Sequence, residues 1–475
     1  MSKEERDYFE NEENIGEMLN RFKRSLALGR KSYFDVSEFE RIVEQLLDEG
    51  DINGSEIAAR QGIQIHPGAV PLQLKYAQVL ISKGKYQYAL KYLEMAEKVE
   101  LTNPDVHLMK GTAWLLTGET KNAERSFRKA LKYAGEEKDD ILYHMANAFV
   151  QSGDIKKAVE HFEQSLLINP ENEQALYDLG FYSDQSGDFQ KSIEYYNRYL
   201  DIDPFNFSIW FNLGISYNKA GNYEKAIEAY EFALALNEDF DQSLFNIGNA
   251  FANAGKFREA IERYNDYLEF DPENDDAWSY IGECYLNLDE HDKATFYYRK
   301  AIKLNVDNDA AWFGLGLVNW VEKKLTKSVQ YIKKAIKIDS LNPEYLMTLA
   351  KVYKEQEHPV LADKALSEAA GIEADNPEIW LTWVELLCEQ KDVSRAITVL
   401  KNGLNTCNDP RLKYRMVSLL LENHQEKDAL NMLTDAMNQD FVQLNYLYDV
   451  YPKALKNKRL KKIVDRFREQ KELFG

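Results

Sequence analysis

Small residues recur along the chain at a nearly constant interval, and bulky apolar residues flank each of them with helical spacing. The first series repeats every 34 positions, with a single interval of 35, and comprises Ala77, Gly111, Ala146, Gly180, Gly214, Gly248, Gly282, Gly316 and Ala350. A second small residue lies 12 residues after each member of the first series. This second series comprises Ala89, Ala123, Ala158, Ser192, Ala226, Ala260, Ala294, Ser328 and Ala362, and it continues at Ala396. A fixed period of this length is typical of a repeat protein.

The residues around each small position predict two helices per period. If the first small residue is numbered position 8, position 4 is mostly a large apolar residue and position 11 is usually aromatic or aliphatic, as in Trp210 and Tyr217. Positions 4, 8 and 11 share one stripe of a helix, and positions 20, 24 and 27 form a matching stripe on a second helix. A glycine such as Gly187 marks the turn between them, and an Asx-Pro turn such as that at Pro204 often ends the second helix.

This pattern resembles the tetratricopeptide repeat family, which has a large residue at position 4, Leu-Gly at 7 and 8, an aromatic residue at 11, Ala at 20, an aromatic residue at 24, Ala at 27 and Pro at 32. The match covers about residues 36–440, some twelve units, and is closest from Ala77 to Ala362. The resemblance implies an all-α solenoid, a right-handed superhelix of stacked helix-turn-helix pairs whose first helices line the concave side. Such units stabilise one another through their interfaces, because one repeat alone buries too little apolar surface.

The chain is predicted to have three parts. Residues 1–35 form an acidic segment with a capping helix, residues 36–440 form the repeat array of about twelve units, and residues 441–475 form basic capping helices. The apolar stripe of the first cap, within residues 15–30, comprises Ile15, Met18, Leu19, Phe22 and Leu26. The apolar face of the last segment is expected to comprise Leu455, Leu460, Ile463, Val464 and Phe467.

Charge and composition narrow the range of partners. The formal net charge is −20, and so acidic a surface repels phosphate backbones, which argues against nucleic acid as a partner. The longest apolar runs are a few residues, far short of a transmembrane helix, and the acidic N-terminal residues do not resemble a secretory signal. Three widely spaced cysteines predict neither a disulfide framework nor a CxxC metal site. These features predict a cytoplasmic protein.

No motif for catalysis or cofactor binding is found in the sequence. It has no Gly-rich dinucleotide loop, Walker loop, HExxH motif or nucleophile elbow. The seven histidines lie at different repeat positions, which argues against a metal site, and the repeats and caps leave too little sequence for a catalytic domain. We therefore expect no enzyme activity, no metal and no cofactor.

Function is expected on first-helix residues outside the packed stripe, at positions 2, 5, 6, 9, 12 and 13, which face the concave groove in the family. In the fourth to eighth units the candidate binding residues are Tyr143, Asn147, Tyr177, Phe181, Phe211, Asn212, Asn218, Phe245, Asn246, Asn249 and Asn253. Asparagine can hold a peptide backbone because its amide both donates and accepts hydrogen bonds. Asn212 and Asn246, at the same position of consecutive units, resemble two rungs of the asparagine ladder in some peptide-binding tetratricopeptide superhelices. The alternative is that Asn is simply common on exposed faces and that Phe211 or Phe245 packs against a neighbour.

The same positions indicate the charge of the partner. Family members that capture chaperone C-terminal carboxylates use Lys or Arg at positions 2, 5 and 6, and units four to eight have neither residue there. A peptide partner is therefore expected to be neutral or basic. Residues 451–475 carry nine Lys or Arg against three Asp or Glu and form a second candidate contact surface.

The leading hypothesis is a non-catalytic scaffold or adaptor that binds a partner protein or an extended peptide in the groove. Two alternatives are a self-associating assembly element and a regulatory subunit of an enzyme complex. RNA recognition is disfavoured by the charge of the chain.

Overall fold

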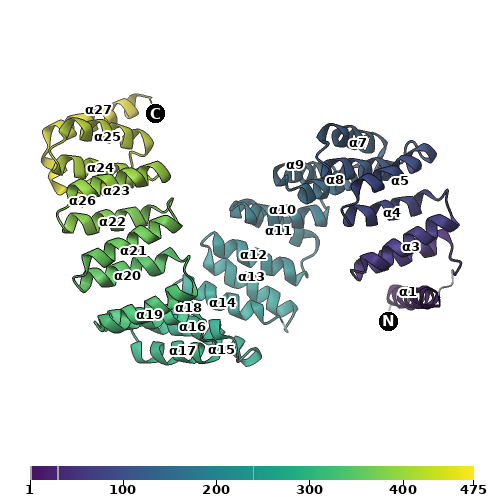
Figure 1. The fold of residues 1–475 in the computed structure, drawn as a ribbon, viewed down its shortest axis with the longest axis horizontal. Helices are drawn as coiled ribbons and strands as arrows, with labels where there is room; N and C mark the ends of the chain where they lie inside the picture. Colours follow the sequence, from purple (N-terminus) through teal and green to yellow (C-terminus); the bar gives the residue numbers. More distant parts are fainter. Residues whose placement is uncertain (1–2, 29–31, 239, 475) are drawn as a thin grey trace. The chain divides into compact units, whose positions relative to one another are not determined.

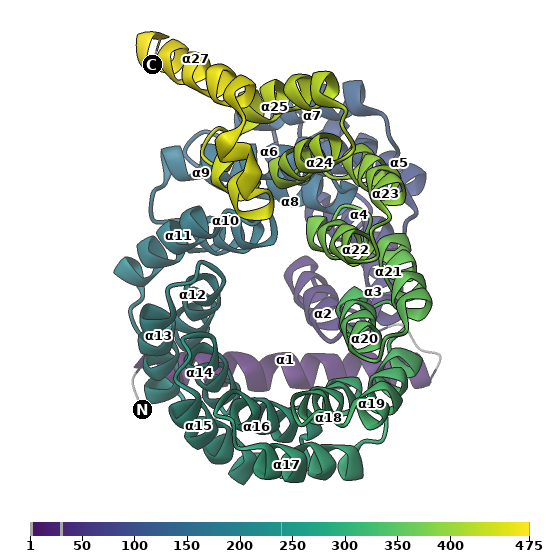
Figure 2. The same cartoon turned by 90° about the vertical axis from the view of Figure 1, so that its left-hand side faces the viewer.

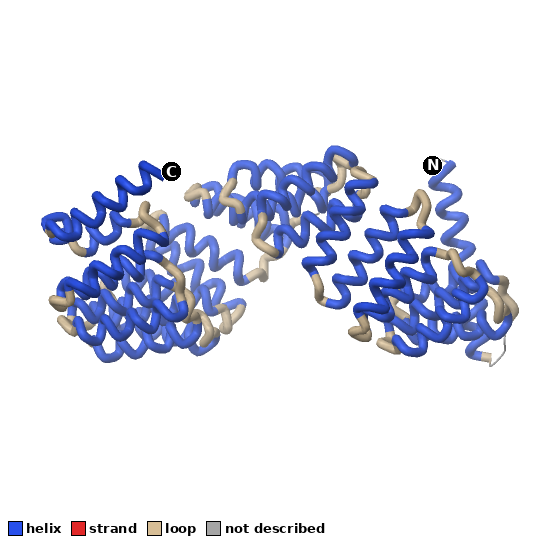
Figure 3. The backbone as a smooth tube through the Cα atoms, turned by 90° about the horizontal axis from the view of Figure 1, so that it is seen from above, coloured by secondary structure: helices blue, strands red, loops and turns tan. Residues whose placement is uncertain are grey.

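All regular secondary structure is helical in the residues that the computed structural model describes, which are 3–28, 32–238 and 240–474 (Figure 3). Side chains are described between residues 15 and 469 within these ranges. The chain divides into two units, Met1–Asp239 (unit 1) and Phe240–Gly475 (unit 2), and each is described by itself. Both are built from successive helix pairs, which confirms the predicted all-α solenoid.

Unit 1 begins with α1 and continues with six helix pairs among its described residues, stacked in chain order (Figure 1). Its helices are α1 (Lys3–Ala27), α2 (Val36–Asp48), α3 (Ile52–Ile65), α4 (Val70–Ser82), α5 (Tyr86–Val99), α6 (Pro104–Leu116), α7 (Thr120–Tyr133), α8 (Lys138–Ser152), α9 (Ile155–Ile168), α10 (Glu173–Gln185), α11 (Phe189–Ile202), α12 (Phe207–Lys219) and α13 (Tyr223–Leu236).

Unit 2 contains six further pairs and a terminal segment in its described part. Its helices are α14 (Gln242–Asn253), α15 (Phe257–Phe270), α16 (Asp275–Asn287), α17 (His291–Leu304), α18 (Asp309–Val321), α19 (Leu325–Ile338), α20 (Pro343–Glu355), α21 (Pro359–Ile372), α22 (Pro377–Glu389), α23 (Val393–Thr406), α24 (Pro410–Glu422), α25 (Glu426–Gln439), α26 (Leu444–Val450), the 3-10 helix η1 (Pro452–Lys456) and α27 (Lys458–Phe474). Within unit 2, the first helices α16, α18, α20 and α22 follow the inner side of a curve and their partners follow the outer side (Figure 2).

In four consecutive central pairs, from α10 and α11 to α16 and α17, a glycine at position 8 faces a tyrosine ring at position 24. A Cβ added to Gly214 would lie 2.5 Å from Cε1 of Tyr230, and one added to Gly248 would lie 2.6 Å from Cε1 of Tyr264. Real Cβ atoms do not approach rings so closely, so only glycine lets the tyrosine lie flat against the first helix. The equivalent tyrosines are buried, and burial raises the pKa of each phenol; they are Tyr196, Tyr230, Tyr264 and Tyr298.

Asparagine caps most first helices from the fifth repeat onward. The side chain of Asn172 accepts a hydrogen bond from the Ala175 N–H at 3.0 Å, and Asn308 accepts one from the Ala311 N–H at 2.6 Å. These bonds satisfy amides that have no partner within the helix. The same cap is made by Asn206, Asn274, Asn342 and Asn376.

Tryptophan at position 4 ties a repeat to the loop that precedes it. The indole N–H of Trp278 donates to the carbonyl oxygen of Pro272 at 3.0 Å, and that of Trp312 donates to the carbonyl of Val306 at 2.8 Å. Trp210 makes the same bond to Pro204, at 2.9 Å. The indole therefore fills the interface with its ring and fixes the loop with its polar edge.

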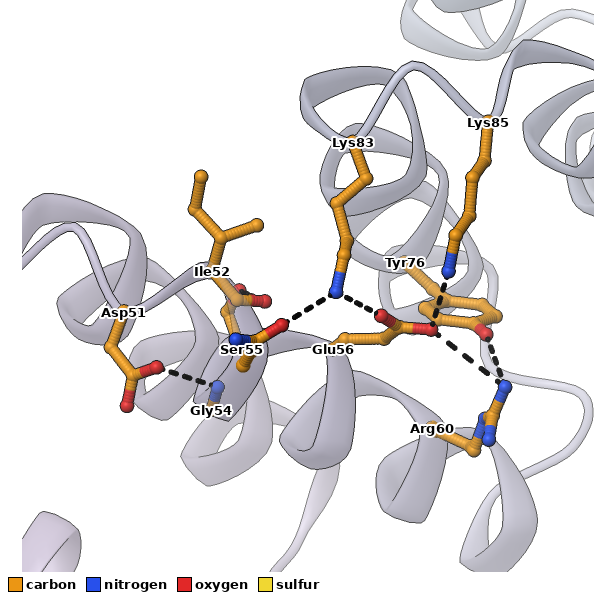
Figure 4. Close-up of polar contacts among 10 residues, drawn as sticks. Asp51, Ile52, Gly54, Ser55, Glu56, Arg60, Tyr76, Lys83 and Lys85 are labelled. Atoms are coloured by element: carbon orange, nitrogen blue, oxygen red, sulfur yellow. Dashed lines mark hydrogen bonds and ion pairs between the residues drawn. The ribbon is translucent and has the colours of Figure 1, made fainter.

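Ion pairs join neighbouring repeats. Glu56 on α3 accepts hydrogen bonds from Lys83 at 2.5 Å and Lys85 at 3.4 Å, and both lysines belong to the next repeat (Figure 4). Arg60 lies 3.7 Å from the same carboxylate and donates to the hydroxyl of Tyr76 at 3.4 Å. The lysine hydrogen bonds lower the pKa of Glu56. Such pairs connect adjacent repeats only, as expected for a solenoid.

The two ends differ in part from the expectation. Helix α1 buries Met18, Leu19 and Phe22, but it begins at Lys3, before the apolar stripe, where glutamate, a good helix former, is frequent. Residues 29 and 30 of the expected stripe segment lie outside the described residues. At the other end α27 buries Leu460 and Val464, whereas Leu455 was wrongly placed on that face: it is 60% exposed because it belongs to η1.

Candidate partner-binding groove

The first helices of unit 1 line a groove with a volume of about 920 Å³. Its residues come mainly from α2, α4, α6 and α8. The floor is apolar and includes Leu74, Ile81, Leu108, Met109 and Leu116. The polar side chains around it include Glu40, Glu44, Lys75, Asp105, His144 and Asn147.

Helix geometry explains why these side chains share the groove. Positions 4, 8 and 11 of each first helix pack against the second helices, so positions 5, 6, 9, 12 and 13 face the other way. Leu74 and Leu108 both occupy position 5, while Met109 and His144 both occupy position 6. The groove is therefore formed by equivalent residues of consecutive repeats.

The groove carries more negative than positive charge. Three carboxylates line it, and the one lysine, Lys75, is in direct contact with the Glu44 carboxylate. Burial raises the pKa of Glu40, and the Glu44 charge adds to this, although Lys75 partly opposes the shift. A carboxylate whose charge is disfavoured in this way would be stabilised by a further cation nearby.

Two of the predicted residues in unit 1 belong to a polar cluster beside this groove. Tyr143 packs against Phe162 with ring centroids 5.5 Å apart, and its hydroxyl is hydrogen-bonded to Asn147 and Asp178. Burial raises the pKa of Asp178, and the Tyr143 hydrogen bond partly offsets that effect. Of the eleven predicted side chains, Asn147 is the one that lines the 920 Å³ groove.

The remaining predicted residues of unit 1 differ in exposure. Tyr177 and Phe181 are each 40% exposed, so their rings are accessible. Phe211 is half-buried, with its ring centroid 5.5 Å from that of Tyr230. Asn212 and Asn218 are half-buried on the same helix, α12.

In unit 2, the predicted residues take part in internal contacts. Phe245 lies among Tyr264, Tyr267 and Tyr280, with ring centroids 5.7, 5.2 and 5.6 Å away. The Asn249 side-chain oxygen accepts the Tyr264 hydroxyl at 2.7 Å, so it supports the position-24 tyrosine. The Asn246 amide donates to the Gln242 carbonyl at 3.0 Å.

The predicted asparagines of unit 2 therefore differ from residue to residue. Asn246 keeps its side-chain oxygen as an acceptor, whereas the oxygen of Asn249 is already used. Asn253 is exposed at the end of α14. Asn212 and Asn246 belong to different units, so no shared site is described for them.

A smaller groove of about 340 Å³ lies among first helices of unit 2. Its polar residues are largely paired. The Trp320 indole donates to Glu355 at 2.9 Å, Lys323 pairs with the same carboxylate at 3.0 Å, and Lys354 pairs with Glu389 at 2.6 Å. Because these lysines and glutamates neutralise one another, the groove of unit 2 has less unpaired charge than the groove of unit 1.

The apolar floor of unit 1 was not predicted, because the groove positions were considered only in the fourth to eighth repeats. The same positions in the second and third repeats give Leu74, Ile81, Leu108, Met109 and Leu116. The available signal was the aliphatic or methionine side chain at several of these positions, in contrast to the aromatic residues at position 5 and the polar residues at position 6 farther along the chain.

Neither a metal centre nor a membrane segment is found in the described part of the chain. No group of three or more His, Cys, Asp or Glu side chains there could hold a metal ion. Among those same residues, no helix has the length and apolar content needed to cross a bilayer.

The repeat geometry agrees with the comparisons to known proteins. A family model described as the Cilia and flagella-associated protein 70 C-terminal domain, a tetratricopeptide repeat model, matches residues 171–440, more than half of the chain. The chain belongs to this tetratricopeptide repeat family. A second model, described as Tetratricopeptide repeat, matches residues 139–172. No curated protein matches the chain at a significant level.

Several solved structures resemble this tetratricopeptide repeat chain. The MamA protein is 26% identical over 37% of this chain and 96% of its own, with a TM-score of 0.32. Yeast Tom70 is 15% identical over 82% of this chain and 95% of its own, with a TM-score of 0.42. The structure described as the APC/C hetero-tetramer Cut9-Hcn1 is 14% identical over 91% of this chain and 96% of its own, with a TM-score of 0.37. At these scores the likenesses carry no argument about function.

Proposed function

We propose that the chain is a non-catalytic protein-interaction scaffold, and that the groove of unit 1 binds a partner segment with apolar and basic side chains. Tetratricopeptide folds are protein-interaction scaffolds in general, and the more specific proposal rests on one observation. The groove combines an apolar floor with three carboxylates and only one lysine, which is already in contact with Glu44.

The apolar floor would supply most of the binding free energy. Leu74, Met109 and Leu116 are each half-buried, so a partner side chain would remove their remaining apolar surface from water. Methionine adapts its shape to different partners more readily than a branched residue. An extended segment would place alternate side chains on this floor.

The carboxylates would select the charge of that segment. Burial disfavours the charged form of Glu40, and a partner lysine or arginine beside it would relieve that cost. An acidic segment would add a like charge and bind poorly. A neutral or basic partner is therefore expected.

Tyr177 and Phe181 are proposed as a second contact for the same partner in unit 1, because both rings are accessible. Tyr143 and Asn147 would orient it through their hydrogen-bonded cluster. Contacts by Phe211, Asn212, Asn218, Phe245, Asn246, Asn249 and Asn253 remain predictions.

The cytoplasm is the compartment proposed for the chain, because cysteines stay reduced there. The cysteines Cys284, Cys388 and Cys407 are free thiols. Burial raises the pKa of Cys284 to about 12, so this thiol stays protonated and unreactive at neutral pH.

Site-specific photo-cross-linking tests the groove. A photoreactive phenylalanine analogue replaces Gln78, an exposed residue that lines the groove, and a matched protein carries it at Glu94, exposed on the second helix α5. Both are irradiated in cell lysate, including lysate from ciliated or flagellated cells because of the description of the matched family. We expect a discrete adduct with a partner protein from position 78 and none from position 94.

A variant that keeps the fold then tests the chemistry of the site. Met109→Ala together with Glu44→Gln should abolish the adduct at position 78, while circular dichroism and the unfolding midpoint confirm folding. Equal adducts from both positions would contradict the groove assignment. An adduct of two copies of this chain would favour the self-associating alternative instead.

A further inference from the structure

Helix α27 presents a row of cations that the rest of the described chain leaves unneutralised. Lys458, Lys462 and Arg466, here called the basic ladder, are spaced four residues apart and are all exposed. No carboxylate within the described residues forms an ion pair with any of them. Elsewhere in unit 2 many exposed cations are paired, as Arg395 is with Asp363 at 2.6 Å.

The opposite face of α27 is already occupied by packing. Leu460 and Val464 are buried, and the Phe467 ring stacks on Phe441 with centroids 5.4 Å apart. Arg459 fastens the helix to α25 through Glu426 at 2.6 Å. The ladder therefore faces solvent from a helix that the fold holds in place.

The charges at the start of α27 work against the stability of the helix, although Asp465 and Glu469 follow Lys462 and Arg466 at the i,i+3 positions of the same face. Like charges four residues apart repel one another along one face. Lysines in the first turn also oppose the positive end of the helix dipole, and no acidic residue lies in that turn. Charges that cost stability without an internal partner are expected where a ligand supplies the opposite charge.

We propose that the basic ladder binds a short acidic segment of a partner protein, separately from the groove of unit 1. The spacing suits an extended chain, because cations four residues apart on a helix are roughly 6 Å from one another. Alternate residues of an extended strand are about 6.6 Å apart. A segment with Asp or Glu at every second position would therefore meet successive rungs.

A short segment fits better than an extended anionic surface. The 25 residues from 451 carry a net charge of +6, whereas residues 240–450 of the same unit, with 23 Lys or Arg against 35 Asp or Glu, carry −12. A membrane or nucleic acid would approach that acidic part of unit 2 as well and be repelled over about a Debye length, roughly 8 Å in physiological salt. The buried apolar face of α27 is also unavailable for insertion into lipid.

The test uses the full-length protein and a fluorescently labelled peptide of alternating glutamate and serine. Fluorescence anisotropy should show saturable binding that weakens as salt is raised. The triple variant Lys458→Gln, Lys462→Gln and Arg466→Gln should bind on the order of tenfold more weakly. Its unfolding midpoint should be unchanged or higher, because the repulsion within the helix is removed.

A matched triple variant controls for net charge. Lys337→Gln, Lys401→Gln and Lys427→Gln remove three exposed cations from other helices of unit 2, and their affinity should stay within about twofold of the parent. Equal weakening in the two triples, or no saturable binding at all, would overturn the proposal.

Two further measurements address the competing partners. Binding to phosphatidylserine-containing vesicles but not to the peptide would overturn the choice of a protein segment. Self-association that sedimentation detects in the parent and not in the ladder variant would assign the ladder to a second copy, and would also overturn the proposal as stated.

Discussion

The turn inside each repeat has the same backbone conformation in both units but a different residue at its centre. In unit 1 the residue with positive φ is a glycine in every described repeat: Gly50, Gly84, Gly118, Gly153, Gly187 and Gly221. Unit 2 keeps Gly255 in its first repeat and then places Asp289, Lys323, Glu357, Lys391 and His424 at the same point, with φ between 58° and 62°.

This difference shows that the turn follows from helix packing rather than from its own residue. A left-handed conformation costs a residue with a side chain about 1–2 kcal/mol more than it costs glycine. Unit 2 forms the turn despite that cost, because the paired helices and their neighbours determine where the chain must reverse. Glycine is thus favourable but not required.

The largest expected effect tests the packing that both units share. Gly214→Val would force a side chain into the Tyr230 ring and destabilise the protein by about 3 kcal/mol. Adding Tyr230→Leu copies the Val384 and Leu400 arrangement that unit 2 uses at positions 8 and 24. The double variant should be more stable than the two separate effects predict, as measured by urea unfolding in a double-mutant cycle. Simple additivity would show that the two positions are not coupled.

The next effect tests the turns directly. Gly153→Ala should cost about 1–2 kcal/mol because Gly153 ends α8 with φ of 82°. Glu357→Ala places alanine at the equivalent point of unit 2, where a side chain is already tolerated, and should change stability by less than about 0.5 kcal/mol. Similar losses in the two variants would remove the distinction between the units.

A pH titration tests an ion cluster that belongs to unit 1 alone. Burial raises the pKa of Glu97, but hydrogen bonds from Lys110 and Lys129 outweigh it and lower the pKa to about 2. The resulting stability is present above the ordinary pKa, near 4.5, and is lost as the pH falls toward 2. With allowance for solvent screening it is about 1 kcal/mol. The unfolding midpoint of the parent should therefore approach that of Glu97→Gln in acid, whereas a constant difference would contradict the assignment.

The smallest effect should be a gain. Lys391 adopts the left-handed backbone conformation, which glycine adopts at lower cost. Lys391→Gly should therefore stabilise the protein by about 0.5 kcal/mol, since the greater flexibility of glycine in the unfolded chain offsets part of the benefit. Lys401→Gly, in the middle of α23, is the opposite control and should destabilise it. Chemical unfolding of both variants measures the contrast.

The repeat architecture could be predicted because its determinants recur at fixed positions. The small residue at position 8, the ring at position 24 and the position-4 tryptophan each appear several times, so accidental matches are averaged out. Helix α1 could be predicted only from its apolar stripe, which begins at Ile15, since the residues before it show no apolar repeat at helical spacing. Leu455 was misplaced because a helical period does not show that the 3-10 helix η1 ends at Lys456 and that α27 begins only at Lys458.

The groove could be predicted by position but not by repeat. Whether a first-helix residue stays accessible depends on partners that lie outside its own helix. Phe245 is surrounded by three tyrosines, and the Asn249 oxygen accepts a hydroxyl from α15, although both occupy groove positions. Leu74, at the same position as Phe245, and Met109, at the neighbouring position 6, line the groove. One sequence does not distinguish these cases.

The glycine–tyrosine pairs also give the central repeats an absorbance signal that reports their opening. An ionised phenol absorbs at longer wavelength than a neutral one, and burial keeps Tyr196, Tyr230, Tyr264 and Tyr298 neutral beyond the ordinary range of tyrosine. Above about pH 10 an opened repeat gains a phenolate that a closed repeat resists, so alkali favours opening. The repeats with Ile332 and Leu400 at the equivalent position lack that trigger, whereas the repeat with Leu366 buries a different phenol, Tyr345. After a rapid jump to alkaline pH, the rise in phenolate absorbance would record in real time the opening of the repeats that bury a tyrosine.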